Sequence, residues 1–245
     1  MISFSVFISD LHLAAERPAI VDAFFRFLGG PARGAHALYV LGDLFEYWVG
    51  DDDLDDPLNT SVAGGFARLA AEGTAVYFMH GNRDFLVGAQ FAQRAGARLL
   101  DDPARVDLHG TPTLLMHGDT LCTDDVDYQK FRAYARDPRN QARFLGQPVA
   151  ARHAEMEALR HRSESAKLDK SAEIMDVNAV AVEDALRKAG CPPRLIHGHT
   201  HRPARHFHRV DGRECERWVL GDWYERGSYL RCDETGCVSV TLDSR

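Results

Sequence analysis

The sequence lacks the features that define several large classes of protein. No apolar run approaches the roughly 18 residues that a membrane-spanning helix requires. The N-terminus has no basic segment and its apolar stretch stops at Asp10, so we expect no signal peptide and a chain that stays in the cytoplasm. The net charge of −7 gives no sign of nucleic-acid binding. The chain has 245 residues, of which 45% are apolar. This length and composition are ordinary for a globular protein and support one sizeable core.

Cysteine is sparse and follows no recognisable pattern. The chain has five cysteines, an odd number, and none forms a C-x-x-C pair, so the sequence indicates neither a disulfide framework nor a zinc ribbon. Cys122 lies close to a polar cluster described below, but no base is spaced to make it a nucleophile. The others are expected to be buried or incidental thiols: Cys191, Cys215, Cys232 and Cys237.

Five short polar clusters are the most informative feature that is present. Almost every one follows a short apolar run, which is typical of a strand end, and residues just past strand ends line the crevice of an α/β sheet. Their Asp, Asn and His side chains are ligands for divalent metals. Together they predict a metal-dependent hydrolase with two metals. The clusters are Asp10-Leu11-His12, Gly42-Asp43, Gly81-Asn82-Arg83-Asp84, His117-Gly118-Asp119 and Gly198-His199-Thr200-His201.

Each cluster also has a purely structural explanation. Asp10 and His12 would point to the same side if the backbone stays extended, but a turn Asp beside a surface His gives the same pattern. Asp43 could bridge two cations or cap a helix. Asn82 suits a β-turn, and His117 could be a hydrogen-bonded histidine near the core. The prediction therefore depends on all the clusters occurring together.

The segment around residue 200 is the hardest to explain structurally, because lining up several imidazoles has little structural benefit. His199 and His201 are predicted ligands. His197 shares their alternation but lies inside the predicted strand, so it is left out of the ligand set. His206 and His208 are expected at surface or strand positions.

The pattern of apolar runs predicts an α/β protein. Alternating strands and helices up to residue 120 indicate a largely parallel sheet covered on both faces, and the later strands indicate a second, antiparallel-rich sheet. Strands are predicted at 4–8, 37–41, 75–79, 105–108, 113–116, 194–197, 204–210, 216–220, 228–232 and 238–242, and helices at 19–28, 62–71, 85–94 and 172–188.

Two charged segments stand out from this pattern. Residues 128–170 contain no convincing strand and carry ten basic and five acidic residues, which gives +5 in a chain of −7. We interpret this segment as a basic helical insert. The acidic run Asp51, Asp52, Asp53, Asp55 and Asp56 is expected to be a solvated loop.

In order and spacing, the five clusters resemble the signature blocks of the calcineurin-like metallophosphoesterase superfamily. The resemblance spans residues 10–201 and implies a four-layer α/β/β/α sandwich with a dinuclear centre between two sheets. It implies that Asp43 bridges the two metals. The first metal would be held by Asp10, His12, Asp43 and His201, and the second by Asp43, Asn82, His117 and His199.

One departure narrows the resemblance. Most of the superfamily has His after the Asn, whereas this chain has Arg83, and Gly81-Asn82-Arg83-Asp84 is similar to the UDP-2,3-diacylglucosamine hydrolase family. Segments 9–13, 41–46, 117–125, 174–178 and 196–203 agree. This implies an enzyme with two Mn²⁺ ions that splits a nucleotide-sugar lipid, UDP-2,3-diacylglucosamine, into UMP and 2,3-diacylglucosamine 1-phosphate in lipid A synthesis.

The same resemblance implies how the chain is divided and which residues meet the substrate. The catalytic core would comprise 1–124 and 186–245, with a helical cap insertion at 125–185 over the acyl chains. Catalytic roles would fall to Arg83 and Asp43. Substrate contacts would come from Asn82, Arg83, Asp125, Ser163, Lys167, Lys170 and His199. Apart from the resemblance, the apolar residues of the insert could line a site for acyl chains or pack an ordinary helical hairpin: Phe131, Tyr134, Phe144, Leu145 and Val149.

A diacylated substrate resides in a membrane, and the basic insert would be attracted to an anionic leaflet by about 1 kcal/mol per residue near its surface. We therefore expect the protein to associate peripherally with the cytoplasmic face of the inner membrane. We also expect it to be a monomer. Two alternatives stay open: another nucleotide pyrophosphatase or phosphodiesterase with the same fold, and a non-catalytic metal-binding scaffold.

Overall fold

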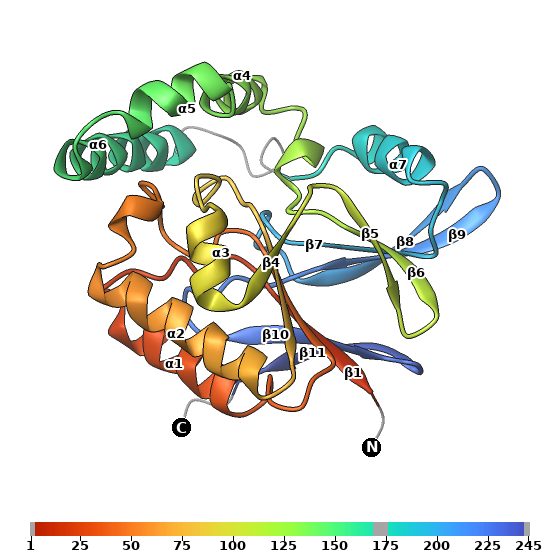
Figure 1. Ribbon diagram of the computed structural model, residues 1–245. Helices are drawn as coiled ribbons and strands as arrows, with labels where there is room; N and C mark the ends of the chain where they lie inside the picture. The colour runs from red at the N-terminus through yellow and green to blue at the C-terminus, as the bar shows by residue number, and fades with distance from the viewer. Residues whose placement is uncertain (1–2, 169–175, 243–245) are drawn as a thin grey trace.

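The computed structural model describes residues 3–168 and 176–242, with backbone only at 161–168 (Figure 1). Within this part of the chain a first sheet has six strands in the order β11-β10-β1-β2-β3-β4. The strands from β1 to β4 are parallel, whereas β10 pairs antiparallel with both β1 and β11. Their bounds are β1 (Phe4–Ile8), β2 (Ala37–Leu41), β3 (Ala75–Met79), β4 (Ala97–Leu100), β10 (Ser228–Asp233) and β11 (Gly236–Thr241).

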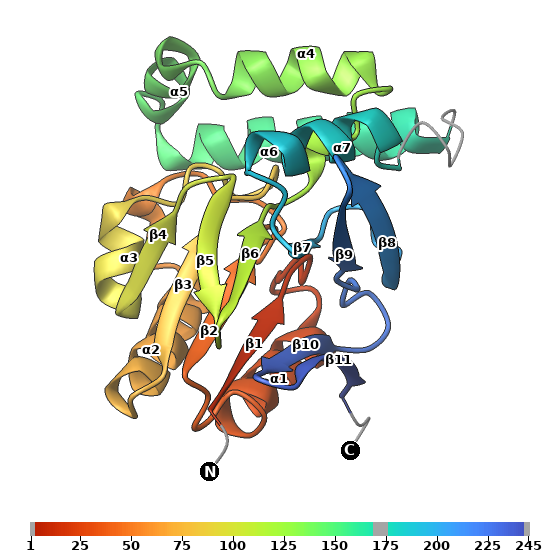
Figure 2. The same cartoon turned by 90° about the vertical axis from the view of Figure 1, so that its right-hand side faces the viewer.

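The second sheet faces the first (Figure 2). Among the described residues it has five strands in the order β5-β6-β7-β9-β8, with β6, β7 and β9 parallel and the two outer pairings antiparallel. Their bounds are β5 (Ala104–Leu108), β6 (Thr111–Leu115), β7 (Arg194–His197), β8 (Ala204–Val210) and β9 (Arg213–Val219).

Three apolar clusters separate four layers, because alternate residues of a strand face opposite sides. In β1, Val6 and Ile8 pack against the helices α1 (Pro18–Gly29), α2 (Pro57–Ala71) and α3 (Ala89–Ala95). Phe7, between them, packs in the cluster that joins the two sheets. On the far side of the second sheet, Leu114 and Leu195 pack against α7 (Ala179–Lys188). The predicted α/β/β/α sandwich is confirmed.

The strand predictions at 4–8, 37–41, 75–79, 194–197 and 204–210 are confirmed residue for residue. The assignment of the last strands to a separate sheet is wrong for β10 and β11, which extend the first sheet beside β1. The second sheet also contains three adjacent parallel strands, so it is not mainly antiparallel. The pattern missed β4, a short strand whose middle residues are exposed.

Two smaller predictions also need correction. The helix expected at 172–188 begins only at Ala179, because the Asn178 side chain caps it by accepting hydrogen bonds from the next amides; positions 172–175 lie outside the described residues. The cysteine prediction is wrong for Cys232 and Cys237. They lie opposite each other on β10 and β11 and form a disulfide.

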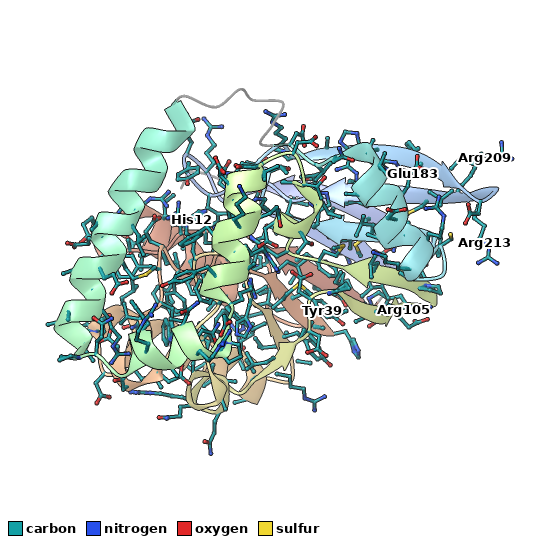
Figure 3. The ribbon with its side chains drawn as sticks, turned by 90° about the horizontal axis from the view of Figure 1, so that it is seen from above. His12, Tyr39, Arg105, Glu183, Arg209 and Arg213 are labelled. Carbon is teal, nitrogen blue, oxygen red and sulfur yellow. A yellow bond between two sulfur atoms is a disulfide. The ribbon has the colours of Figure 1, made fainter. Side chains whose placement is uncertain are left out.

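The basic insert forms three helices above the sandwich: α4 (Val126–Ala135), α5 (Pro138–Leu145) and α6 (Val149–Leu168) (Figure 1). Seen from above, His12 lies between the ribbons of α4 and α6 (Figure 3). Among the described residues, no helix is both long and apolar enough to cross a membrane. We call α4, α5 and α6 the cap.

Part of the acidic run contacts the cap, so the run is only partly the solvated loop that was expected: Asp55 and Asp56 are exposed, whereas Asp52 and Asp53 contact α6. Asp52 forms an ion pair with Arg152 of α6, whose side chain is 1% exposed, and Asp53 lies 2.9 Å from Nε2 of His153. Asp51 accepts hydrogen bonds from Gly88 N and from two amides at the start of α3. The buried Arg152 and its ion pair with the half-exposed Asp52 thus hold α6 against the core.

Candidate metal centre and active site

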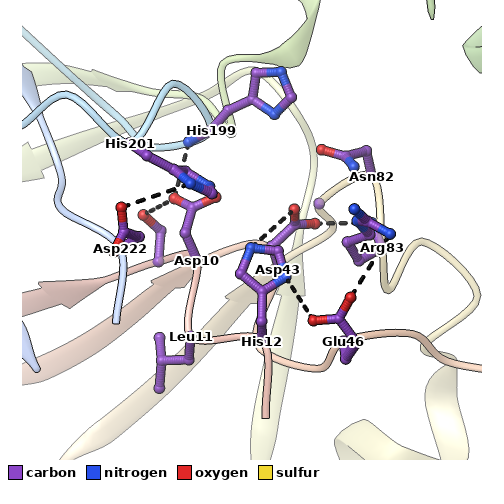
Figure 4. A network of polar contacts seen from close by, with 12 residues as sticks. Asp10, Leu11, His12, Asp43, Glu46, Asn82, Arg83, His199, His201 and Asp222 are labelled. Carbon is purple, nitrogen blue, oxygen red and sulfur yellow. Dashed lines mark hydrogen bonds and ion pairs between the residues drawn. The ribbon is translucent and has the colours of Figure 1, made fainter. Parts of the chain in front are cut away.

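The predicted ligands converge where strands of both sheets end (Figure 4). Clusters that follow β1, β2 and β3 come from the first sheet, and those that follow β6 and β7 come from the second. Because parallel strands end at a common edge, five segments distant in sequence meet at one place. All the predicted metal ligands lie in it: Asp10, His12, Asp43, Asn82, His117, His199 and His201.

Six of these side chains form two groups of three, and the Asp43 carboxylate belongs to one group and faces the other. In each group the ligand atoms lie within 4.8 Å of one another: Asp10, His12 and His201 in the first, and Asp43, His117 and His199 in the second.

Asp43 faces both groups. Its Oδ2 is 3.9 Å from Nε2 of His12, and its Oδ1 is 3.8 Å from Nε2 of His117. Asn82 Oδ1 is 3.0 Å from the same His117 nitrogen and so joins the second group. One oxygen of Asp43 toward each group is the arrangement that a bridging ligand requires.

The backbone at Asp10 and His12 does not meet the condition of an extended chain under which their side chains were expected to point to the same side. Asp10 has φ 57° and His12 has φ 50°, in the left-handed region. Asp43, His199 and His201 share this conformation, with φ between 53° and 68°. Non-glycine residues adopt it at a cost of about 1–3 kcal/mol, and such strain concentrates at functional sites. Here Asp10 N donates to the Gly42 carbonyl at 3.1 Å and His12 N to the Asp43 carbonyl at 3.0 Å.

Two glycines allow the strand ends to approach each other. A Cβ at Gly42 would lie 2.5 Å from Gly81 Cα, and a Cβ at Gly81 would lie 2.1 Å from Asp43 Oδ1. Neither position has space for a side chain. The glycines of these two clusters thus permit the close contact that centres the Asp43 carboxylate.

Asp84 is a structural residue that the sequence argument missed, although it belongs to a quoted cluster. It is fully buried and accepts hydrogen bonds from Gly81 N at 2.8 Å, Leu44 N at 2.8 Å and Asp43 N at 3.2 Å. Burial raises its pKa, and the amide hydrogen bonds oppose that shift. It holds together the two turns that carry Asp43 and Asn82.

The site carries several protonatable groups whose pKa values are shifted. Burial raises the pKa of Asp43 to about 7. Burial opposes a charge on His117, but Asp43 and other carboxylates raise its pKa to about 9. Burial and the positive His117 lower the pKa of His199 to about 3, so its imidazole is neutral. For Asp10 burial acts upward, but hydrogen bonding and attraction to His201 bring the pKa below its usual value.

This donor set fits divalent cations. It combines buried carboxylates with imidazoles and an amide oxygen, and each group surrounds a point that a cation could occupy. Metal ligands bind in their deprotonated forms, so a bound cation would compete with protons at these groups. The two groups could therefore hold two metal ions, with Asp43 shared.

Supporting residues around the first group were also missed. Glu46 is 7% exposed and lies 3.5 Å from His12 Nδ1, 3.8 Å from an Arg83 nitrogen and 3.3 Å from Nε of Arg160 on α6. Asp222 lies 3.6 Å from Nδ1 of His201. Carboxylates of this kind orient ligand imidazoles. A carboxylate that follows a predicted ligand cluster, as Glu46 follows Asp43, was the available signal.

A cavity of about 590 Å³ joins the predicted metal centre to the cap. Its floor includes Asn82, Arg83 and His199, and the predicted substrate residue Asp125 lies on its wall. Apolar side chains from the cap and from the core line the rest: Phe85, Leu86, Phe131, Tyr134, Phe144, Met156 and Leu159.

Five residues that were predicted in the cap are not seen to line this cavity or lie outside the described side chains, and they fall into two sets. Leu145 and Val149, which were expected in the lining, are not among the residues that line this cavity. Ser163 and Lys167 belong to α6, but their side chains lie outside the described residues, as does Lys170 entirely.

The remaining histidines and the cysteine behave as expected. His197 is buried and its Nε2 lies 3.0 Å from Arg217, away from the ligand groups. His206 and His208 lie on β8. Cys122 is buried, and burial raises the pKa of its thiol to about 12, which makes it a poor nucleophile.

Comparison with known proteins identifies relatives over nearly the whole chain. Residues 5–203 match the model of the calcineurin-like phosphoesterase family. A UDP-2,3-diacylglucosamine hydrolase from Aromatoleum aromaticum is 56% identical over 232 residues, 95% of this chain and 94% of that protein. Proteins of the same name from Stenotrophomonas maltophilia and Cellvibrio japonicus are 52% and 50% identical, covering 97% and 98% of this chain and 98% and 99% of their own.

A solved structure shows the same fold at low identity. The dimetal phosphatase from Danio rerio is 13% identical, with a TM-score of 0.50 and 99% coverage of both chains. At this identity the similarity concerns the fold alone.

A first prediction concerns the glycine beside Asp43. Gly81→Ala should weaken Mn²⁺ binding about 10- to 100-fold, because the new Cβ would displace the carboxylate that both groups share. Isothermal titration of the metal-stripped protein measures this. Gly29→Ala is the control, since a Cβ there meets nothing within 4 Å. Unchanged Mn²⁺ affinity in Gly81→Ala would contradict the central position of Asp43.

Proposed function

The chain belongs to the calcineurin-like phosphoesterase family, and we propose that it hydrolyses the pyrophosphate bond of UDP-2,3-diacylglucosamine to UMP and 2,3-diacylglucosamine 1-phosphate, a step of lipid A synthesis. One observation carries the proposal: a single cavity has polar metal-ligand residues at its floor and apolar cap side chains above. A substrate with a pyrophosphate and two acyl chains matches both parts. The names of the relatives at 50–56% identity agree with it.

The proposed cofactors are two Mn²⁺ ions, with Asp43 as the bridge. Asp10, His12 and His201 complete the first site, and the second is completed by Asn82, His117 and His199. When bound, two such cations supply Lewis acidity toward the phosphoryl oxygens and an acidified water as nucleophile. The residues themselves orient the pyrophosphate at the floor of the cavity.

Arg83 would stabilise the charge that develops on the phosphate. Its backbone N–H donates to Asp43 Oδ1 at 2.8 Å, which places the residue directly beside the proposed bridge, and its side chain lines the cavity. A guanidinium does not readily give up a proton, so Arg83 acts as an electrostatic group and not as a general acid. A phosphate leaving group needs less protonation than an alkoxide, which suits this arginine.

The cap would bind the rest of the substrate. Asp125, Ser163, Lys167 and Lys170 are proposed contacts to the lipid-linked sugar, with Asn82, Arg83 and His199 below. We propose 1–124 and 186–245 as the catalytic core and 125–185 as the insertion. α7 packs on the second sheet, and no residue of α7 is among those that line the cavity.

We also propose that the protein works as a monomer on an anionic membrane surface, the cytoplasmic face of the inner membrane. Large apolar side chains of the cap are exposed, among them Val126, Phe131, Tyr134 and Leu145. Contact between these exposed side chains and a lipid surface would let acyl chains pass into the cavity.

The decisive experiment is product analysis with added Mn²⁺. We expect UMP and 2,3-diacylglucosamine 1-phosphate, with activity lost on chelation. UDP-sugars without acyl chains should show a kcat/KM more than about tenfold lower, since each buried methylene contributes ~0.8 kcal/mol. Equal hydrolysis of acylated and plain UDP-sugars would favour another nucleotide pyrophosphatase. Stoichiometric metal without turnover of any phosphoester would favour a scaffold.

Arg83→Ala should lower kcat about 10²- to 10³-fold without loss of metal, because its side chain stabilises developing charge but is not a proposed ligand. Steady-state kinetics and elemental analysis for Mn measure the two quantities. Arg98→Ala, at an exposed position of β4, is the matched control and should behave as the parent. If Arg83→Ala loses its metals, the proposed role is wrong.

Co-sedimentation with vesicles tests the membrane proposal. Binding should require anionic lipid and decrease with salt, since salt screens the attraction beyond a Debye length of about 10 Å at 0.1 M ionic strength. Phe131→Ser should bind less. The control is Phe207→Ser, which changes a 71% exposed phenylalanine on β8, away from the cap, and should bind as the parent. Sedimentation that ignores both lipid charge and salt would argue against surface binding.

A further inference from the structure

One face of α4 is polar and points into the catalytic core. Tyr128 and Arg132 of α4 and Arg136, its C-cap residue, are spaced four residues apart and so lie on the same side of the helix. Each of them hydrogen-bonds a loop that carries a proposed metal ligand. A cap that only covered the substrate could contact the core anywhere, but these three residues all contact loops that carry proposed metal ligands.

The first of these contacts holds the loop after β6. Asp119, two residues beyond His117, is fully buried, and its Oδ2 accepts a hydrogen bond from Tyr128 Oη at 2.6 Å and from Arg132 Nε at 2.7 Å. Its backbone carbonyl accepts from Gln129 Nε2 at 2.8 Å. Three residues of α4 thus converge on one residue beside a proposed ligand.

The second contact holds the loop after β3. Arg136 Nη2 donates to the Gly81 carbonyl at 2.9 Å, and its guanidinium lies 5.5 Å from the centre of the Phe85 ring. Gly81 directly precedes Asn82. β3 belongs to the first sheet and β6 to the second, so α4 braces two loops that come from different sheets.

We propose that Arg132 and Arg136 are positioning residues that set the spacing between Asn82 and His117 and thereby assemble the second metal site. The two ligands meet at 3.0 Å, directly between the anchored loops. This inference rests on the proposed dinuclear function, and it assigns part of the cap to building the metal centre in addition to covering the substrate.

The first ligand group, Asp10, His12 and His201, is supported by residues outside α4, so the proposal predicts an effect on the second metal site alone. Arg17 donates to the His12 carbonyl at 2.9 Å and to the Trp223 carbonyl at 3.1 Å, and the Tyr224 ring stacks on the His12 ring with centroids 5.4 Å apart. These contacts come from the core. Loosening α4 should therefore weaken one metal site and spare the other.

The test is Mn²⁺ titration of metal-stripped Arg132→Met and Arg136→Met, combined with steady-state kinetics. We expect one of the two Mn²⁺ equivalents to bind about 10- to 100-fold more weakly, the other to change little, and kcat to fall. Arg132→Lys, which keeps the charge toward Asp119, should recover part of the affinity. Arg139→Met is the control: its side chain is 91% exposed and pairs with Asp137 of its own helix start.

Several outcomes would overturn the proposal. Parent-like affinity for both equivalents would do so, as would a rise in KM alone, which would show that the arginines act on substrate. Equal weakening of both equivalents with a lower midpoint of urea unfolding would show a general structural role. Because titration needs no substrate, a parent protein that fails to hydrolyse UDP-2,3-diacylglucosamine would reject the proposed function and leave this comparison valid.

Discussion

The burial of Asp43 between two groups of imidazoles is the interaction on which the site depends. A buried carboxylate is costly unless positive charge or hydrogen bonds compensate for it. Here the amide of Arg83 donates to one oxygen, and His12 and His117 approach from opposite sides. The geometry in turn requires Gly42 and Gly81, because a side chain at either position would collide with the opposite turn. The position of Asp43 therefore depends both on how the strand ends pack and on the glycines in the two turns.

The convergence of the ligands could be predicted because it follows from strand order. Short apolar runs such as 37–41 and 75–79 are buried strands, parallel strands end at one edge, and the polar residues just beyond them must meet there. No local pattern, however, reveals the left-handed backbone of Asp10 and His12, because that conformation is imposed by long-range contacts. Examples are Asp10 N with the Gly42 carbonyl and His12 N with the Asp43 carbonyl.

The errors have the same physical origin. A strand's own sequence specifies which of its faces is buried but not which strand it pairs with, so β10 and β11 were assigned to the wrong sheet. The disulfide needs the hairpin register that places Cys232 opposite Cys237, which spacing alone does not give. The acidic run was misjudged because its partners, Arg152 and His153, lie about a hundred residues later in the chain.

The structure also changes how the basic insert should be interpreted. Of its ten basic residues, Arg132, Arg136, Arg152 and Arg160 contact core groups: the Asp119 carboxylate, the Gly81 carbonyl, the Asp52 carboxylate and the Glu46 carboxylate. At about 1 kcal/mol per residue near an anionic leaflet, the full count overstates the attraction by up to ~4 kcal/mol. These four arginines thus fasten the cap to the core. Membrane contact would then depend on the exposed apolar side chains of the cap together with the remaining basic residues.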